Sequence, residues 1–328
     1  MIRSRVNCLF GSLAVLALLA LAVPGCQPRP APATEQSGGS GEGQELLPVT
    51  LSQGDRLRVV ATTNIVGDVV GRVGGEQIEL TTLMGVGVDP HSYVPTPAGT
   101  AAVHDAHVVF ASGAGLEEFM EEMLESAGGE SVQIYLSDGL ELREAGHGHK
   151  GEGEKADPHV WFDVRNVIQW VEAIEQTLSA LDPANEEAYG ANAGAYVREL
   201  EELDGWIVEQ IATVPEGNRK LVTNHPAFGY LAGRYGLEQV GAVYPISPSA
   251  EPSARDIAAL HDTVREYGVP AVFAESTVNS KLVEQLAGDT GVKLVPLYSG
   301  SLGGPGSGVE SYVALMRHDV TAIVEALK

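Results

Sequence analysis

Three histidines of this sequence occur in short motifs whose residue types suit metal binding. His91 lies in Asp-Pro-His-Ser-Tyr, His159 in Asp-Pro-His-Val-Trp and His225 in Asn-His-Pro-Ala-Phe. Three converging imidazoles form a ligand set that suits Zn²⁺ and is also used by Mn²⁺ and other first-row ions. A single loop histidine is usually an ordinary surface residue. The repeated Asp-Pro-His, followed two residues later by an aromatic residue, favours a shared site instead.

Asp89 and Asp157 open the two Asp-Pro-His motifs. Proline restricts the backbone of the residue before it, and an aspartate carboxylate in such a turn can accept hydrogen bonds from the residues that follow. A carboxylate beside a metal-binding imidazole can also fix the orientation of the ring. We therefore expect Asp89 and Asp157 to support the histidines as outer partners of the ion.

Each histidine motif follows a predicted strand, directly or after an insertion. In α/β proteins, ligand sites lie beyond the carboxyl ends of the strands, so these positions suit a common site. Short β-rich runs alternate with amphipathic helical segments from residue 56 onward. The predicted strands are 57–63, 78–84, 107–111 and 132–136 before a helical middle, and 220–223, 239–244, 271–274 and 293–297 after it.

The predicted fold is α/β, with two βα lobes whose sheets are mainly parallel. The length of 328 residues suits two lobes that each bury their own core. Helical patterns cover 163–181 and 183–211, and the second is long enough to join the lobes as one rigid helix. We expect an N-terminal lobe at 55–182, a linking helix at 183–214 and a C-terminal lobe at 215–328, with the metal site in the cleft between the lobes.

The N-terminus has the features of an export signal. Residues 1–25 contain a basic start and an apolar run at 9–23, which is shorter than the roughly 18 residues needed to span a bilayer. Val-Pro-Gly-Cys ending at Cys26 resembles a bacterial lipobox and predicts lipidation of Cys26; the alternative is an ordinary signal that leaves a free thiol. Residues 26–54 are rich in Pro, Gly, Ser and Glu, which predicts a flexible tether to the outer face of the cell membrane.

The charge excludes one class of partner. With 44 acidic and 20 basic residues, the formal net charge is -24. Nucleic-acid binding requires many cationic contacts to phosphates, so we expect no nucleic-acid partner.

Several segments together resemble the zinc/manganese-type solute-binding lipoproteins of bacterial ABC transporters. They are the three histidine motifs, Ala-Glu-Pro-Ser at 250–253, Phe-Ala-Glu-Ser at 273–276 and Leu-Tyr-Ser-Gly-Ser-Leu at 297–302. The resemblance extends from about residue 56 to the C-terminus. It implies that a monomer holds a metal ion between two lobes and passes it to a membrane permease powered by an ATPase. His91, His159 and His225 match the ligand positions of the family.

The fourth ligand position departs from the family pattern. Many members carry an aspartate in the loop after the last strand, where this sequence has Gly300. Glu275 ends a neighbouring strand and is our tentative fourth ligand. A structural role for Glu275, with water completing the coordination, is the alternative.

Two further features favour zinc over manganese. Manganese-selective relatives tend to carry a glutamate at the third ligand position, whereas His225 gives a nitrogen-rich site. The insertion at 146–155 contains His147 and His149, which resemble a short form of the histidine-rich loop of zinc-specific relatives. We interpret them as auxiliary metal-capturing residues; an ordinary solvated loop is the alternative.

The sequence therefore predicts an exported metal receptor without enzymatic activity. Three histidines with an open position also describe catalytic zinc, but we find no His-Glu-x-x-His motif, no Gly-x-Ser-x-Gly elbow and no cysteine nucleophile. The alternatives to zinc capture are a manganese receptor, a metal-binding adhesion lipoprotein and a zinc hydrolase.

Overall fold

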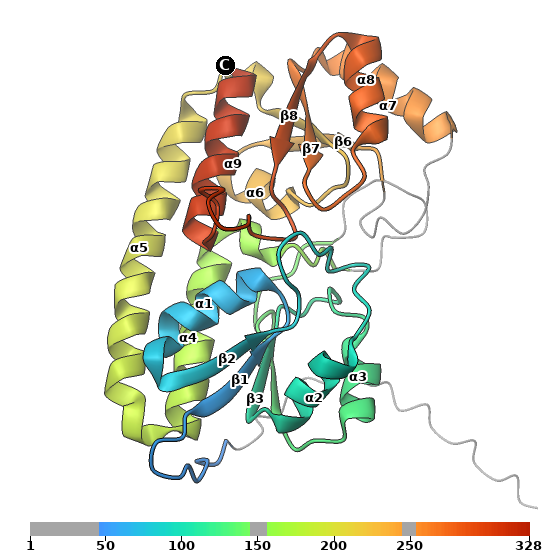
Figure 1. Cartoon of the computed structure of the whole chain (residues 1–328). Helices are drawn as coiled ribbons and strands as arrows, with labels where there is room; N and C mark the ends of the chain where they lie inside the picture. The colour runs from blue at the N-terminus through green and yellow to red at the C-terminus, as the bar shows by residue number, and fades with distance from the viewer. Residues whose placement is uncertain (1–45, 145–155, 245–253) are drawn as a thin grey trace, which may run out of the picture. The chain divides into compact units, whose positions relative to one another are not determined.

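The computed structural model describes residues 46–144, 156–244 and 254–328, and each half of this chain builds a four-stranded parallel sheet (Figure 1). The predicted fold class of two α/β lobes with parallel sheets is thereby confirmed. The predicted signal peptide, Cys26, His147 and His149 lie outside the described residues. Within the described ranges, no helix is long and apolar enough to cross a membrane.

The first sheet has the strand order β2-β1-β3-β4. All four residues of β3 are buried, as expected for a strand covered by helices on both faces. In Figure 1, α1 lies on one side of this sheet, and α2 and α3 lie on the other. The elements are β1 (Leu57–Ala61), α1 (Asn64–Gly74), β2 (Ile78–Thr82), α2 (Pro97–Asp105), β3 (Val108–Ala111), α3 (Met120–Ala127) and β4 (Val132–Tyr135).

The second sheet repeats this arrangement with the order β6-β5-β7-β8. β7 is its most buried strand and ends on Glu275, one residue later than predicted. The elements are β5 (Lys220–Thr223), α6 (Gly229–Tyr235), β6 (Glu238–Ala242), α7 (Ala254–Tyr267), β7 (Ala271–Glu275), α8 (Lys281–Thr290), β8 (Lys293–Leu297) and α9 (Tyr312–Leu327).

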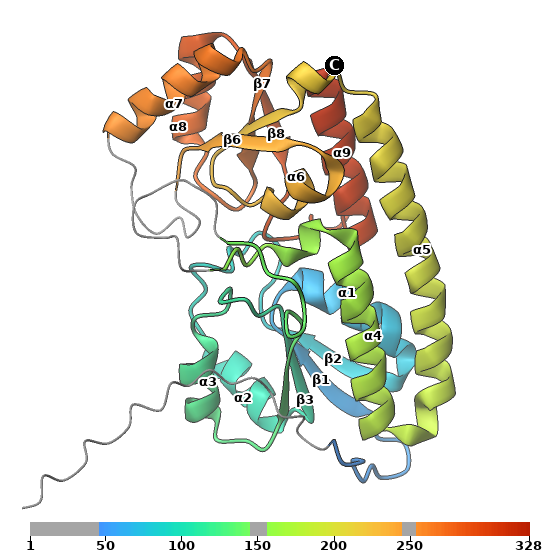
Figure 2. The ribbon, with the colours of Figure 1, turned by 180° about the vertical axis from the view of Figure 1, so that it is seen from behind.

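Two antiparallel helices connect the sheets. α4 (Val164–Leu181) packs along α5 (Glu186–Ala212), and α5 also contacts α1 of the first lobe and α9 of the second (Figure 2). The buried residues of α5 recur every three or four positions, which gives the helix one apolar face for both lobes. The predicted linking helix at 183–214 is shorter at both ends, because residues 183–185 form a separate 3₁₀ turn and the helix ends at Ala212.

The first two strands end earlier than predicted, at Ala61 and Thr82. Thr63, predicted as strand, instead caps α1: its hydroxyl accepts a hydrogen bond from the Val66 N–H at 3.1 Å. Threonine has high β-propensity, but capping a helix uses its hydroxyl. The helix that follows therefore determines where β1 ends.

The expectation of a separate core in each lobe is wrong. One hydrophobic cluster extends from Leu57 of the first sheet to Phe273 of the second. Among the described residues, smaller separate clusters lie under α2 and α3 and under α7 and α8. Phe162 and Phe228 join the two sides, with ring centroids 4.6 Å apart. These aromatic residues follow the histidine motifs closely, so the segments that carry the ligands also fill the interface between the lobes.

Candidate metal centre

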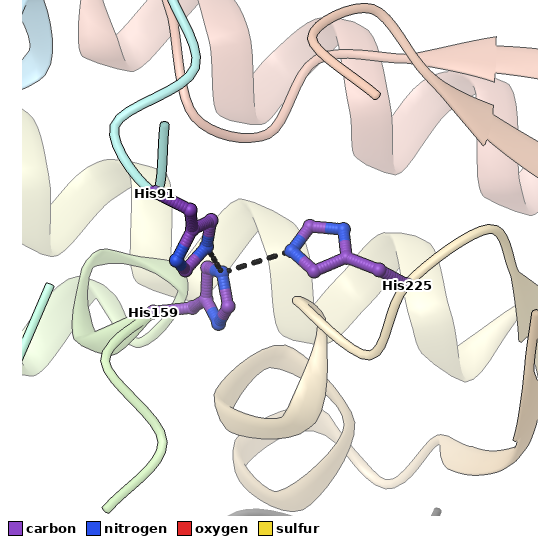
Figure 3. Close-up of side chains that lie close together, drawn as sticks. All are labelled: His91, His159 and His225. Atoms are coloured by element: carbon purple, nitrogen blue, oxygen red, sulfur yellow. Dashed lines mark hydrogen bonds between the residues drawn. The ribbon is translucent and has the colours of Figure 1, made fainter. Parts of the chain in front are cut away.

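The three predicted histidines come from both lobes and point toward one another (Figure 3). His91 lies in the loop between β2 and α2, and His159 immediately precedes the 3₁₀ turn Val160–Phe162 that leads into α4. His225 lies two residues after the end of β5. His159 and His225 are buried, whereas His91 is partly exposed. Among the described residues, these three form the one cluster that could hold a metal ion.

The two Asp-Pro-His motifs have the same local geometry. The Asp89 carboxylate accepts a hydrogen bond from the His91 N–H, and the Asp157 carboxylate accepts one from the His159 N–H, both at 3.0 Å. Asp157 also lies 2.8 Å from Nδ1 of the His159 ring, so it fixes the ring as well as the backbone. For Asp89 the structure gives contacts to the backbone of His91 and to the hydroxyl of Ser92.

Glu275 occupies, beside His225, the position that Asp157 has beside His159. One oxygen of Glu275 accepts a hydrogen bond from the His225 N–H at 3.1 Å, and the other lies 2.7 Å from His225 Nδ1. The Asn224 side-chain oxygen accepts from the backbone N–H groups of both His225 and Glu275, which ties the end of β5 to that of β7. Each buried imidazole is thus held by a buried carboxylate at Nδ1, leaving Nε2 for the cluster.

The Nε2 atoms converge at a spacing suited to one ion. His159 Nε2 lies 3.1 Å from Nε2 of His91 and 3.1 Å from Nε2 of His225. Tetrahedral zinc with bonds of about 2.0–2.1 Å would place its nitrogen ligands roughly 3.3 Å apart. The three ligand nitrogens all lie within 4.8 Å of one another, so a small adjustment of the rings would accommodate an ion bound by all three.

Burial controls the protonation of this cluster. Burial, followed by the charges of His159 and His225, lowers the pKa of His91 to about 2. Burial also lowers the pKa of His159 well below its usual range. For His225 burial acts in the same direction, but the charge and hydrogen bonding of Glu275 outweigh it and raise the pKa. His91 and His159 are therefore held as neutral imidazoles, the form that binds metal.

The placement of Glu275 differs from the tentative assignment as a fourth ligand. Its carboxylate contacts Nδ1 of His225, whereas Nε2 of that ring faces the cluster, so the carboxylate lies on the opposite side of the ring. β7 ends on Glu275, whose side chain is 2% exposed, and the Glu275 N–H donates to the Asn224 side-chain oxygen at 3.1 Å. We therefore infer that Glu275 orients the His225 ring.

Gly300 has a structural reason to lack a side chain. A Cβ atom at this position would lie 2.8 Å from Cδ of Pro90 and 3.2 Å from Cγ of the same ring. Pro90 directly precedes His91, so the loop that carries this ligand packs against the backbone at Gly300. An aspartate at position 300 would require that loop to move.

Tyr230 and Arg143 connect the two lobes at this site, and neither was predicted from the sequence. The Tyr230 hydroxyl donates to the Asp157 carbonyl at 3.1 Å and accepts from the Arg143 N–H at 2.9 Å. Tyr230 belongs to a recognisable segment after His225, so its aromatic ring could have suggested a role. Arg143 stands alone in a loop, and nothing in its sequence neighbourhood indicates this contact.

Comparison with known proteins agrees with the fold. The family model described as zinc-uptake complex component A, periplasmic, matches residues 59–326. The manganese-binding lipoprotein MntA of Halalkalibacterium halodurans is 36% identical over 282 residues, covering 85% of this chain and 91% of that protein.

Two solved structures extend the comparison. The periplasmic zinc binding protein TroA from Treponema pallidum has a TM-score of 0.77 at 30% identity and covers 83% of this chain and 99% of its own. A manganese-bound periplasmic metal binding protein from Candidatus Liberibacter asiaticus has a TM-score of 0.75 at 25% identity, covering 84% and 100%. The chain belongs to the family of zinc-uptake complex component A, the metal-binding solute-binding lipoproteins of ABC transporters, which confirms the resemblance.

Proposed function

We propose that this protein captures one zinc ion outside the cytoplasm and delivers it to an ABC permease driven by its ATPase. The convergence of three Nε2 atoms from two lobes is the observation that supports this proposal. The metal is the transported substrate, bound by His91, His159 and His225. The chain acts as a receptor and catalyses no reaction.

Zinc is proposed because the donor set is rich in nitrogen. The two buried carboxylates near the cluster, Asp157 and Glu275, contact Nδ1 atoms of the histidine rings. Manganese prefers carboxylate and other oxygen ligands, whereas imidazole suits zinc. Manganese remains the second candidate, because MntA and the structure from Candidatus Liberibacter asiaticus carry that metal in their names.

A competition experiment separates the two ions. The chain starting at residue 27 is purified without added metal, analysed for its metal content and then titrated with Zn²⁺ and Mn²⁺ in the presence of a calibrated chelator. We expect about one ion per chain and a zinc affinity at least roughly a hundredfold above that for manganese, because the ligands are imidazoles. Equal affinities or a preference for manganese would contradict the zinc assignment, and the absence of binding would contradict the receptor function.

Glu275→Gln tests the outer position of this carboxylate, because it keeps the shape and removes the charge. We expect zinc affinity to fall about 10- to 100-fold, the loss typical of an outer partner of a metal-binding histidine. Isothermal titration with a competing chelator measures the change, and Glu284→Gln at an exposed position of α8 is the matched control. A loss as large as that for His225→Ala would identify Glu275 as a direct ligand, and an unchanged affinity would exclude both roles.

The remaining parts of the chain fit the same proposal. We propose that residues 1–25 are removed on export, that a lipid on Cys26 holds the monomer at the outer face of the membrane, and that residues 26–54 serve as the tether. His147 and His149 would capture metal ahead of the main site. The described residues on either side of that insertion are paired: Glu144 forms a β-bridge with Ala156, and Asp157 donates its N–H to the Arg143 carbonyl at 2.8 Å.

A further inference from the structure

Residues 298–302, here called the bridging loop, connect β8 to the segment before α9. The loop belongs to the second lobe, yet it contacts both histidine-bearing loops of the first lobe. Residues 299–302 are buried. At its start, the Tyr298 N–H donates to the buried Asp319 of α9 at 3.0 Å, which anchors the loop in its own lobe.

Ser301 and Asn64 form side-chain hydrogen bonds that connect the bridging loop to the first lobe. The Ser301 hydroxyl accepts hydrogen bonds from the Gly87 N–H and from Asn64 Nδ2, both at 2.8 Å, and donates to the Leu302 carbonyl at 3.0 Å. The Asn64 side-chain oxygen accepts from the Leu302 N–H at 3.0 Å. Asn64 begins α1, and Gly87 lies four residues before His91. Three hydrogen bonds therefore connect the first lobe to two adjacent residues of the second.

Two more contacts bring the bridging loop beside the metal ligands. Pro90 packs against Gly300 so closely that a Cβ atom has no room. The Ser299 carbonyl accepts a hydrogen bond from the indole N–H of Trp161 at 3.1 Å, and the Trp161 ring lies 5.4 Å from the His159 ring, centroid to centroid. The bridging loop thus contacts the segments that carry His91 and His159 without itself supplying a nitrogen to the cluster.

We propose that the bridging loop determines how long the site retains its ion, with Ser301 and Gly300 as the positioning residues. This inference rests on the proposed function. His91 and His225 belong to different lobes, so separating them requires the His91 loop to leave the second lobe. That movement breaks the hydrogen bonds of Ser301 and the Pro90–Gly300 packing together. Contacts that must break during opening slow dissociation, while association depends mainly on encounter and changes less.

Ser301→Ala is the first test. It removes the hydroxyl that accepts from Gly87 and Asn64 and leaves two donors without their partner at a buried interface. Zinc dissociation is measured by stopped-flow mixing of the zinc-loaded chain with excess fluorescent chelator, and association is measured by mixing the metal-free chain with Zn²⁺. We expect the dissociation rate to rise about 10- to 100-fold and the association rate to change less than about threefold.

A control variant and two further variants accompany Ser301→Ala. Ser307→Ala removes an exposed hydroxyl that accepts a hydrogen bond from the Val309 N–H within the same lobe. We expect this control to associate with zinc and release it at the rates of the parent chain. Gly300→Ala should accelerate dissociation by displacing Pro90, even if Ser301→Ala does not fold. Asn64→Ala combined with Ser301→Ala should have less effect than the two changes added together, because the residues share a hydrogen bond.

Three outcomes would overturn the inference. One is parental dissociation rates in both Ser301→Ala and Gly300→Ala. Another is an affinity loss that arises wholly from slower association. The third is lowered thermal stability with unchanged rates, which would indicate a purely structural role. If the parent chain fails to bind zinc, the proposed function itself fails, so the two failures are distinguishable.

Discussion

Replacing His159 by alanine is expected to weaken zinc binding roughly a thousandfold, more than the 10- to 100-fold typical of a lost outer partner. His159 is the central member of the cluster, because its Nε2 lies 3.1 Å from the Nε2 atoms of both other histidines. Its removal leaves two nitrogen ligands and deprives Asp157 of its partner at Nδ1. Isothermal titration with a competing chelator measures the loss, and His91→Ala and His225→Ala should lie within about tenfold of it.

The metal-free His159→Ala chain should nevertheless fold, since none of the three histidines belongs to the hydrophobic cluster or to the strands of either sheet. Circular dichroism and a thermal melt check this expectation. His104→Ala is the matched control, because His104 is exposed on α2 and contacts the Ala127 carbonyl outside the cluster. Zinc affinity within about threefold of the parent in any of the three ligand variants would exclude that histidine as a ligand.

Zinc affinity is also expected to fall at least about a hundredfold between pH 7 and pH 5. The pKa of His225 is raised above its usual value, so a proton must leave this ring before its Nε2 can bind. Burial raises the pKa of Asp157 to about 7, and metal on His159 favours the ionised carboxylate at Nδ1. The pKa of His91 is about 2, so this ring carries no proton to displace in that range.

The direction of this change in zinc affinity with pH follows from the protons that are released when the metal binds. The metal-bound state holds fewer protons than the metal-free state below about pH 7, so affinity rises with pH and levels off once both groups are deprotonated. Each proton released changes affinity about tenfold per pH unit. Titrations in buffers of different ionisation enthalpy count these protons, and Asp157→Asn should reduce the count. An affinity that stays constant from pH 7 to pH 5 would rule out His225 and Asp157 as the groups that titrate.

The histidine cluster could be predicted because its signal is local. His91 and His159 follow strands of the first sheet, and parallel strands of one sheet end at the same edge, so their loops lie together. His225 follows a strand of the second sheet and meets them where the two lobes face each other. The strands 220–223 and 293–297 were predicted with their observed ends, since short β-branched and apolar runs bounded by polar residues are easily recognised. The predicted end of a strand was wrong where a residue belongs to the next element instead, as when the hydroxyl of Thr63 caps α1.

The partners of the cluster could not be predicted, because they depend on tertiary packing. Glu275 contacts the Nδ1 side of His225, a placement that depends on how the ends of β5 and β7 pack together. In the sequence, Gly300 indicates only that an expected aspartate ligand is missing. Its close contact with Pro90 depends on the three-dimensional structure. Ser301 and Asn64 are separated by more than two hundred residues, and no local pattern marks their hydrogen bond.

The shared hydrophobic cluster means that the two lobes are not separable modules, although each contains a full parallel sheet. A fragment ending after α4 would lose the contact between Phe162 and Phe228 and would expose the apolar side chains that α5 and α9 cover. Exposed apolar faces of that kind promote aggregation. The hydrophobic cluster reaches from the first strand to the last helix, so synthesis of the final helix completes the apolar interior that the two lobes share.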